Sequence, residues 1–384
     1  MRPGTILPPA TLGMLGGGQL GRFFVAAAHE MGYQVWVLDP DAHSPAGQIA
    51  DRHLQAAYGD FAALDTLAEG CAAITTEFEN VPADTLDYLA KFVPVRPSAA
   101  AVAVCQNRIH EKTFLQVNGL PHGPFAAIGS EDDLREVDAG LFPAILKVAR
   151  FGYDGKGQAV VGDRDEALAA FAHFKGEPCV LEKKLALDYE VSVVLARDEG
   201  GTVCCFPTGE NSHTRGILDV SCVPARAPEA IRRDAEAIAA RIAEKLDYVG
   251  TMGVEFFVSD GRLVVNEMAP RPHNSGHYTL DACVTNQFEQ QVRALCGLPL
   301  GEARAHSAAA MVNLLGDLWY AGSHYREPDW SVLYAVPNLK LHLDGKHHAR
   351  HGRKMGHFTV IGDDPAAVRA SALAARAAIG IRDE

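Results

Sequence analysis

The sequence has no long apolar run, because no stretch approaches the roughly 18 residues that a membrane span requires. Its first residues also lack a basic segment followed by an apolar one, so nothing indicates a secretory leader. Eight cysteines are scattered along the chain without a C-x-x-C pair, which argues against a metal cage and a disulfide framework. We therefore expect a cytoplasmic protein with reduced thiols and no membrane partner.

Positive charge is also in short supply, since 35 Lys and Arg residues face 48 Asp and Glu residues and the net charge is −13. A general nucleic-acid binder needs a broad basic face, so we expect no nucleic-acid partner. The chain has 384 residues, of which 48% are hydrophobic and 22% charged, as in a globular protein of two or three domains. Because acidic residues outnumber basic ones, we expect any basic binding site to be confined to a small part of the surface.

The N-terminal part alternates between strand and helix patterns. Short apolar strands are expected at 11–15, 34–38 and 72–75, and a helix is expected from a glycine-rich turn to residue 29. This β-α-β order predicts a Rossmann-like α/β domain with a parallel sheet.

Gly16, Gly18 and Gly21 follow the first strand as G-x-G-x-x-G, and Asp39 ends the next strand. This pattern is close to the dinucleotide-binding motif, so a nicotinamide dehydrogenase is one hypothesis. A glycine turn at a helix N-terminus holds any phosphate, so a ribonucleotide phosphate near Gln19 is the alternative. A tight turn without a ligand is the third interpretation.

Glu77 and Glu79 follow the third expected strand, at the edge where open α/β sheets bind ligands. The competing interpretation is a charge pair that only complements a helix N-terminus. Pro94 and Pro97 then interrupt the pattern. We expect the first domain boundary just beyond them.

A helix is expected from Cys105 to Asn118, where Gly119 would end it. Arg108 and Lys112 lie four residues apart and so share one face of this helix. Alone, such a face would be solvated. A phosphate site nearby would give it an anion to bind.

The segment 150–158 sets three glycines, an acid and basic residues between apolar runs at 142–147 and 158–161. We expect a hairpin whose glycine-rich loop closes over phosphates, with Lys147 adding a point charge from the strand. The alternative is a surface hairpin, since the spacing matches neither the Walker nor the kinase loop.

Two further strands, at 177–185 and 188–195, carry Glu182 and Glu190. Backbone groups at such a strand end can pair with an adenine edge, while a carboxylate accepts ribose hydroxyls. Exposed strand carboxylates are the alternative. Downstream, residues 228–246 carry an apolar stripe at helical spacing, which predicts a core-facing helix: Ile231, Ala235, Ile238, Ile242 and Leu246.

Glu255 and Glu267 lie on two expected strands, almost equally far from a turn at residues 259–261. Pairing of these strands would place the two carboxylates opposite each other, where like charges repel. A divalent cation resolves the repulsion, and oxygen-only ligands favour Mg²⁺, with Mn²⁺ as an alternative. The sequence therefore predicts a metal site on Glu255 and Glu267.

Five motifs resemble those of ATP-grasp enzymes, and in particular the family of N5-carboxyaminoimidazole ribonucleotide synthetases, over essentially the whole chain. They are GGGQLGR at 16–22, TEFENVP at 76–82, GYDGKGQ at 152–158, NEMAPRPHNSGH at 266–277 and GRKMGH at 352–357. The resemblance implies an α/β and α+β fold in three parts. These are a Rossmann-like (pre-ATP-grasp) ribonucleotide-binding domain at 1–108, an ATP-grasp region with a loop lid at 109–300, and a small C-terminal domain at 301–384 that completes the substrate cleft.

The resemblance also implies a reaction of de novo purine synthesis and a homodimer. Bicarbonate would attack the γ-phosphorus of ATP to give carboxyphosphate and ADP, and the exocyclic amine of 5-aminoimidazole ribonucleotide would then be carboxylated, with release of phosphate. Three rival interpretations are another ATP-grasp carboxylate–amine ligase, a regulator that binds nucleotide without turnover, and the dehydrogenase. The dehydrogenase would leave Glu255 and Glu267 without a role.

The family's roles, carried onto this sequence, imply three sets of residues. ATP would contact Arg108, Lys147, Gly152, Tyr153, Asp154, Gly155, Lys156, Gly157, Gln158, Glu182, Lys183, Lys184, Leu185, Glu190, His213, Asn266 and Glu267. The other substrates would contact Gly18, Gln19, Leu20, Glu77, Asn80, Arg271, His273, Asn274, Lys346, Arg353 and Lys354. In catalysis Asp154 would take the amine proton, and Lys354 would steady the developing carboxylate charge.

Two positions depart from the family's pattern. Ala269 stands where many relatives carry an asparagine after the second metal carboxylate, which leaves a third protein ligand for the metal open. Lys156 replaces a frequent arginine, which keeps the charge but loses the bidentate fork. His273 and His277 lack a cysteine or acid at zinc-binding spacing, so substrate or packing roles are expected for them.

Overall fold

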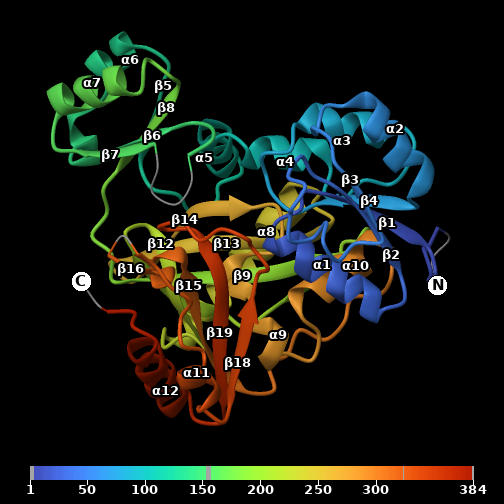
Figure 1. Ribbon diagram of the computed structural model, residues 1–384. Helices are drawn as coiled ribbons and strands as arrows, with labels where there is room; N and C mark the ends of the chain where they lie inside the picture. The colour runs from blue at the N-terminus through green and yellow to red at the C-terminus, as the bar shows by residue number, and fades with distance from the viewer. Residues whose placement is uncertain (1–3, 153–156, 323, 383–384) are drawn as a thin grey trace.

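The computed structural model describes residues 4–152, 157–322 and 324–382. Three β-sheets organise these residues, in addition to one small two-stranded sheet. Figure 1 shows an N-terminal domain in blue, a smaller green lobe that stands apart from the rest, and a large sheet that runs from the centre into the red C-terminal segment.

The N-terminal domain has a parallel four-stranded sheet in the order β3-β2-β1-β4, as the α/β pattern predicts. Strand β3 was not predicted from the sequence, because a strand of three residues is too short to show an alternation of apolar and polar side chains. The strands are β1 (Thr11–Leu15), β2 (Gln34–Leu38), β3 (Arg52–Leu54) and β4 (Ala73–Thr76). The helices are α1 (Gln19–Glu30), α2 (Phe61–Gly70), α3 (Ala83–Leu89) and α4 (Ala99–Cys105).

The helix expected from Cys105 begins later, because a short helix, α4, ends at that residue. The next helix is α5 (Arg108–Val117), and the Asn107 side chain accepts hydrogen bonds from the amides of Ile109 and His110. Asparagine at this position satisfies amides that lack partners within the helix. Arg108 is therefore the first helical residue.

The lobe contains an antiparallel sheet in the order β5-β8-β6-β7. The predicted hairpin is confirmed, since β6 pairs with β7 and Lys147 lies opposite Gln158. Its strands are β5 (Phe125–Ile128), β6 (Ala144–Val148), β7 (Gln158–Val161) and β8 (Cys179–Lys183). Its helices are α6 (Glu131–Glu136), η1 (Ala139–Leu141) and α7 (Arg164–His173).

A nine-stranded sheet fills the centre and continues into the C-terminal segment, in the order β14-β13-β9-β11-β12-β15-β19-β18, with β10 beside β9. Its strands are β9 (Tyr189–Arg197), β10 (Val203–Cys205), β11 (Gly209–Thr214), β12 (Ile217–Val223), β13 (Gly250–Ser259), β14 (Arg262–Ala269), β15 (Ala308–Leu315), β18 (Leu339–Leu343) and β19 (Lys354–Gly362). Because β12 pairs with β15, the strands before and after residue 300 share one hydrogen-bonded sheet.

The remaining elements cover this sheet or connect its strands. They are α8 (Glu229–Lys245), η2 (Asn274–Gly276), α9 (Thr279–Ala282), α10 (Gln287–Leu295), η3 (Gly316–Trp319), β16 (Tyr320–Ala321), β17 (His324–Tyr325), α11 (Ser331–Tyr334) and α12 (Pro365–Ala378). The stripe predicted for 228–246 lies on α8, where Ala235 and Ile242 are fully buried against strands of the central sheet. In the described residues no helix is long and apolar enough to cross a membrane, and the eight cysteines are free thiols.

Three histidines stack where the N-terminal domain, the central region and the C-terminal segment meet. The His357 ring lies 4.6 Å from the His277 ring and 4.7 Å from the His342 ring, and Phe23 of α1 contacts all three. His357 is fully buried, and neither of its ring nitrogens has a hydrogen-bond partner among the described residues. His277 thus takes the packing role that was one of its two expected roles.

The stack holds two of its rings in the neutral form. Burial, together with neighbouring positive charge, lowers the pKa of His277 to about 3. Burial beside His277 and His342 also lowers the pKa of His357 well below its usual 6.5. At the edge of the stack, His342 Nε2 lies 2.9 Å from the Asp281 carboxylate.

We predict that this stack makes the free energy of unfolding depend on pH. The unfolded chain binds protons near pH 6.5 and the folded rings do not, so the stabilisation is complete above that pH and is lost as pH falls below it. The loss is roughly 1.4 kcal/mol per pH unit for each such histidine. His357→Phe should reduce the slope between about pH 6.5 and pH 5 by one proton equivalent in denaturant titrations.

The matched control is His110→Phe, because His110 is exposed on α5. This variant should keep the slope of the original chain. An unchanged slope in His357→Phe would contradict the assignment.

Candidate active site

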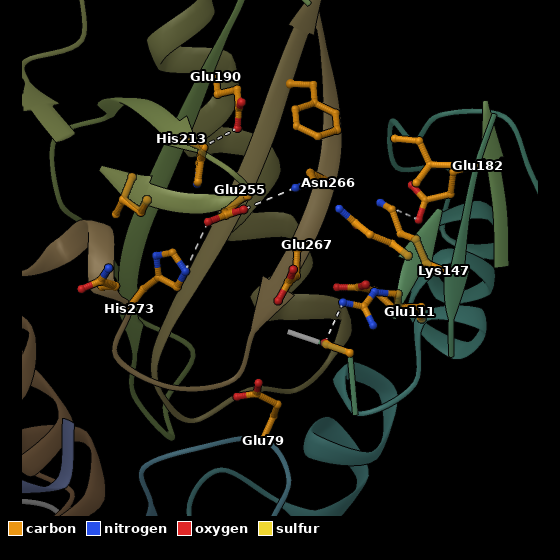
Figure 2. A pocket seen from close by; sticks show the side chains of 18 of the residues that line it. Glu79, Glu111, Lys147, Glu182, Glu190, His213, Glu255, Asn266, Glu267 and His273 are labelled. Atoms are coloured by element: carbon orange, nitrogen blue, oxygen red, sulfur yellow. Dashed lines mark hydrogen bonds and ion pairs between the residues drawn. The ribbon is translucent and has the colours of Figure 1, made fainter. Parts of the chain in front are cut away.

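A cavity of about 300 Å³ lies between the lobe and the central sheet. It brings together residues from all three predicted parts of the chain, and Figure 2 shows several of them pointing toward a common centre. Of the residues expected at the ATP, metal and substrate sites, these line it: Arg108, Lys147, Gly152, Gln158, Glu182, Glu190, His213, Glu255, Asn266, Glu267, Arg271, His273, Asn274 and Lys354.

Glu255 on β13 and Glu267 on β14 are direct partners across the ladder, as predicted. The turn between the strands is short because Asp260 and Gly261 adopt φ of 49° and 68°, which suits a two-residue hairpin. Burial, followed by the charge of Glu267, raises the pKa of Glu255 to about 7. The carboxylate also accepts a hydrogen bond of 3.3 Å from Asn266 Nδ2.

Among the described residues, no group of three or more His, Cys, Asp or Glu side chains is placed to hold a metal ion. The donors that the hairpin offers are therefore two carboxylates. This set fits Mg²⁺, which commonly takes one or two carboxylates and completes its octahedron with water and phosphate oxygens.

Glu190 on β9 and His213 on β11 form an ion pair, with Nδ1 and Oε2 2.9 Å apart. Burial opposes the charged imidazole, but Glu190 and the field of Glu255 outweigh it and raise the pKa of His213. Across the cavity, His273 stays neutral because burial, with Arg271 and Lys354 nearby, lowers its pKa well below 6.5. The cavity thus shifts the pKa values of its two histidines in opposite directions.

Glu182 lies between two lysines at the lobe side of the cavity. Its carboxylate is 3.1 Å from Lys147 Nζ and 3.4 Å from Lys112 Nζ. Burial raises its pKa, but the two ammonium groups outweigh burial and the pKa is lowered overall. Lys183, Lys184 and Leu185 do not line the cavity, and Lys183 donates to the Gly140 carbonyl at 2.9 Å.

Arg108 holds the base of the glycine-rich loop, since its guanidinium donates to the Val148 and Gly152 carbonyls at 3.1 and 2.8 Å. Gly157 has φ of 70°, and a Cβ there would meet Val148 at 2.5 Å. The loop residues expected to contact ATP, namely Tyr153, Asp154, Gly155 and Lys156, lie outside the described residues.

Two acidic lining residues, Glu79 and Glu111, were not assigned to ATP, metal or substrate, although Glu79 was expected at the ligand-binding edge of the first sheet. Glu79 follows β4 and forms an ion pair of 2.6 Å with Arg271. Glu111 on α5 accepts the Met268 amide, and burial raises its pKa to about 8. For Glu79 the sequence signal is its place as the second acid of T-E-F-E-N, and for Glu111 it is the position three residues after Arg108.

Two amides of the glycine turn already have a partner within the N-terminal domain. The Glu77 carboxylate accepts hydrogen bonds from the Gly18 and Gly21 amides, both at 2.6 Å. A Cβ on Gly16 or Gly18 would lie within 2.5 Å of the Glu77 side chain. The glycines therefore admit a carboxylate of the chain itself to the helix N-terminus, where an anion is favoured.

Asp39 also serves the turn, since its Oδ2 accepts the Gly17 amide and the Tyr58 hydroxyl, both at 2.7 Å. The carboxylate that a dinucleotide ribose would need is thus engaged within the domain. This arrangement argues against the dehydrogenase hypothesis.

The remaining expected substrate residues lie outside the main cavity, although some adjoin it. Lys346 donates to Gln19, to Asp344 at 3.0 Å and to the Lys354 carbonyl, so it ties the C-terminal segment to α1. Arg353 donates to the His348 carbonyl at 2.8 Å. Asn80 lines a small adjoining cavity, and Leu20 packs against the core of the N-terminal domain.

We predict that Glu267→Gln stabilises the metal-free protein at alkaline pH. The pKa of Glu255 rises from 4.5 to about 7 on folding, so its contribution to the free energy of unfolding falls as pH rises through that range. Removing the neighbouring charge should raise the free energy of unfolding at about pH 8 by about 1 kcal/mol, allowing for solvent screening, and by less near pH 5. Denaturant titrations with a chelator measure both values.

Glu244→Gln, an exposed change on α8, is the control and should show no such pH dependence. An equal effect of Glu267→Gln at both pH values would count against electrostatic coupling of the two carboxylates.

Family models match three consecutive parts of the chain. They are a ribonucleotide synthetase preATP-grasp domain at residues 9–106, an ATP-grasp domain at 113–288 and a phosphoribosylaminoimidazole carboxylase C-terminal domain at 309–371. Each match lies within one of the three expected parts.

Curated relatives match over nearly the whole chain. The N5-carboxyaminoimidazole ribonucleotide synthase of Bacillus subtilis is 42% identical over 92% of both chains. The synthase of Brucella melitensis is 44% identical over 93% of this chain and 98% of its own.

Solved structures agree with the sequence relatives. An ADP complex of an N5-carboxyaminoimidazole ribonucleotide synthetase superposes with a TM-score of 0.90 at 39% identity, covering 98% of each chain. An Aspergillus clavatus synthase in complex with ADP and 5-aminoimidazole ribonucleotide superposes with a TM-score of 0.87 at 30% identity, covering 96% of this chain and 98% of its own. The chain thus belongs to the N5-carboxyaminoimidazole ribonucleotide synthase family of ATP-grasp ligases.

Proposed function

We propose that this chain carboxylates 5-aminoimidazole ribonucleotide with bicarbonate and ATP, through carboxyphosphate, and that the cavity between the lobe and the central sheet is where the phosphoryl group moves. The observation that carries this proposal is the apposition of Glu255 and Glu267 facing Lys147 across one cavity. Phosphoryl transfer needs little beyond positioning and neutralisation of charge, which this arrangement supplies.

In the proposed mechanism ATP binds with its adenosine toward Glu182 and Glu190 and its phosphates toward Lys147 and Arg108. Glu190 accepts ribose hydroxyls, and its contact with His213 fixes the position of the carboxylate. Apolar side chains beside these groups, Ile145, Leu187 and Phe257, suit the faces of an adenine ring. Backbone amides of the glycine-rich loop, among them those of Gly152, Gly157 and Gln158, would complete the phosphate site.

Glu255 and Glu267 would hold Mg²⁺, or alternatively Mn²⁺, and the ion would neutralise charge on the β- and γ-phosphates. The pKa of Glu255 near 7 supports this, because like charges that repel in the metal-free cavity are relieved by a cation. Asn266 steadies Glu255 through its 3.3 Å hydrogen bond.

The chemical steps follow in order. A bicarbonate oxygen attacks the γ-phosphorus, the bond to the β-phosphate oxygen breaks, and ADP leaves carboxyphosphate behind. The exocyclic amine of the ribonucleotide then takes the carboxyl group as phosphate leaves. Asp154 is the proposed acceptor of the amine proton, and Lys354, which lines the cavity, steadies the carboxylate charge.

The ribonucleotide would bind between the N-terminal and C-terminal parts, with Arg353 holding its phosphate. The contact of Lys346 with Gln19 supports this placement, because it brings the basic C-terminal segment against the start of α1. Glu77, Asn80, Arg271, His273 and Asn274 would continue the substrate path toward the ATP cavity. The expected homodimer, the cytoplasmic location and the division at residues 108 and 300 stay predictions.

An isotope experiment tests the reaction. With ¹⁸O-labelled bicarbonate, one label should appear in the released phosphate, because a bicarbonate oxygen bridges carbon and phosphorus in carboxyphosphate. Mass spectrometry of the phosphate during coupled turnover measures it. Unlabelled phosphate would exclude the intermediate.

A pair of neighbouring substitutions tests the substrate assignment. Arg353→Ala should weaken ribonucleotide binding roughly 10- to 150-fold, the range expected for loss of a charge-assisted hydrogen bond, and leave ATP affinity almost unchanged. Lys354→Ala should lower the coupled rate even at saturating ribonucleotide, because its interaction strengthens as charge develops.

Steady-state kinetics with each substrate varied in turn separates the two effects. Loss of ATP binding in both variants, or unchanged kinetics in both, would remove the C-terminal segment from the proposed substrate site.

A further inference from the structure

Glu79 follows β4 of the N-terminal domain but lines the proposed ATP cavity, where most other lining residues come from the lobe, helix α5 and the central sheet. Figure 2 shows it on the loop of the N-terminal domain, below Glu267. Its Oε2 accepts a hydrogen bond of 2.6 Å from Arg271 Nε, and the side chains are only 24% and 17% exposed. Burial opposes ionisation of Glu79, but Arg271 outweighs it and lowers the pKa of the carboxyl group.

The pair fixes the direction of the guanidinium. Arg271 uses Nε for Glu79 and donates from Nη1 to the Pro272 carbonyl at 3.2 Å, while its backbone amide donates to the Ala269 carbonyl at 2.8 Å. A guanidinium is a planar fork, so two fixed donors set the orientation of the rest. Arg271 lines the cavity together with Glu267 and Lys354, so this guanidinium borders the cavity in which the proposed function places phosphoryl transfer.

The Glu79 backbone is clamped as well. Gln106 Nε2 donates to the carbonyls of Glu79 at 2.6 Å and Val81 at 2.5 Å, which holds the short loop between β4 and α3 against the end of α4. Two residues earlier in the chain, the Glu77 carboxylate contacts the glycine turn, where it accepts hydrogen bonds from the Gly18 and Gly21 amides. One short acidic loop therefore contacts both the expected ribonucleotide site and the expected phosphoryl-transfer site.

From the contacts of this loop we infer that Glu79 is a positioning residue for Arg271. Glu79 aligns the guanidinium when the ribonucleotide holds the loop of the N-terminal domain in position, and ATP cleavage therefore depends on the bound ribonucleotide. The inference rests on the proposed function. Movement of Glu77 or of the glycine turn on ribonucleotide binding would be passed through two residues of backbone to Glu79 and then to the guanidinium. Arg271, in contact with the reacting anion, would respond with a change in the rate of phosphate release.

The test is Glu79→Gln, which keeps the size of the side chain and removes its charge. Phosphate release and carboxylated ribonucleotide are measured in the same reaction. We expect the coupled kcat to fall roughly 10- to 100-fold, as for loss of a charge-assisted contact, while the KM for ATP changes less than about 3-fold. The ratio of phosphate released to product formed should rise above that of the original chain.

Glu79→Asp should restore part of the coupling, because a carboxylate remains. The matched control is Glu289→Gln, which removes the partner of Arg293 in a similar ion pair of 2.8 Å on α10. It should leave rate and ratio unchanged. Thermal melting and ADP binding are recorded for each variant to establish that it is folded.

If Glu79→Gln lowers phosphate release and product formation equally, with the ratio unchanged, the residue has no coupling role and the inference is overturned. An unchanged kcat would overturn it as well. The original chain in the same assay tests the proposed function separately, since a failure there to carboxylate 5-aminoimidazole ribonucleotide is visible before any variant is compared.

Discussion

The structure is built around one unfavourable contact, the meeting of two carboxylates on adjacent strands. The backbone ladder fixes Glu255 opposite Glu267, and burial together with the charge of Glu267 raises the pKa of Glu255. Other acidic groups around the cavity are offset within the chain: Glu79 by Arg271, Glu182 by two lysines and Glu190 by His213. The hairpin carboxylates are thus the pair whose repulsion the proposed cation would relieve.

The N-terminal domain shares no sheet with this centre and is joined to it by an apolar contact between α1 and α10 and by polar side chains. Glu79 pairs with Arg271, Lys346 contacts Gln19, and Arg96 donates to the Leu295 carbonyl at 2.8 Å. Each of these contacts crosses from one part of the chain to another and includes a charged group with a partner of fixed direction. Such contacts set orientation, whereas the hydrophobic clusters, some of which span two parts of the chain, supply most of the stabilisation.

The sequence was sufficient wherever the deciding contacts are local. The Asp260-Gly261 turn sets the hairpin of β13 and β14, but a β-bulge between Glu255 and Phe256, which the residue pattern does not reveal, shifts the register by one residue and places Glu255 opposite Glu267. The sequence around Lys147 also predicted the glycine-rich hairpin. It was insufficient where partners lie far apart, as in the pair of Glu79 with Arg271, since no periodicity records such a contact. The glycine turn shows a second limit: its pattern favours an anion at the helix N-terminus but does not reveal that Glu77 accepts hydrogen bonds from the Gly18 and Gly21 amides.

The pairing of β12 with β15 has a consequence for how the chain is made. During synthesis the strands up to β14 leave the ribosome first, and β12 then offers a row of unpaired amides and carbonyls until β15 and β19 follow. An open strand edge of this kind can pair with another nascent chain. The last 80 or so residues therefore also protect the open edge of β12 from pairing with another chain, a role that they have before any substrate binds.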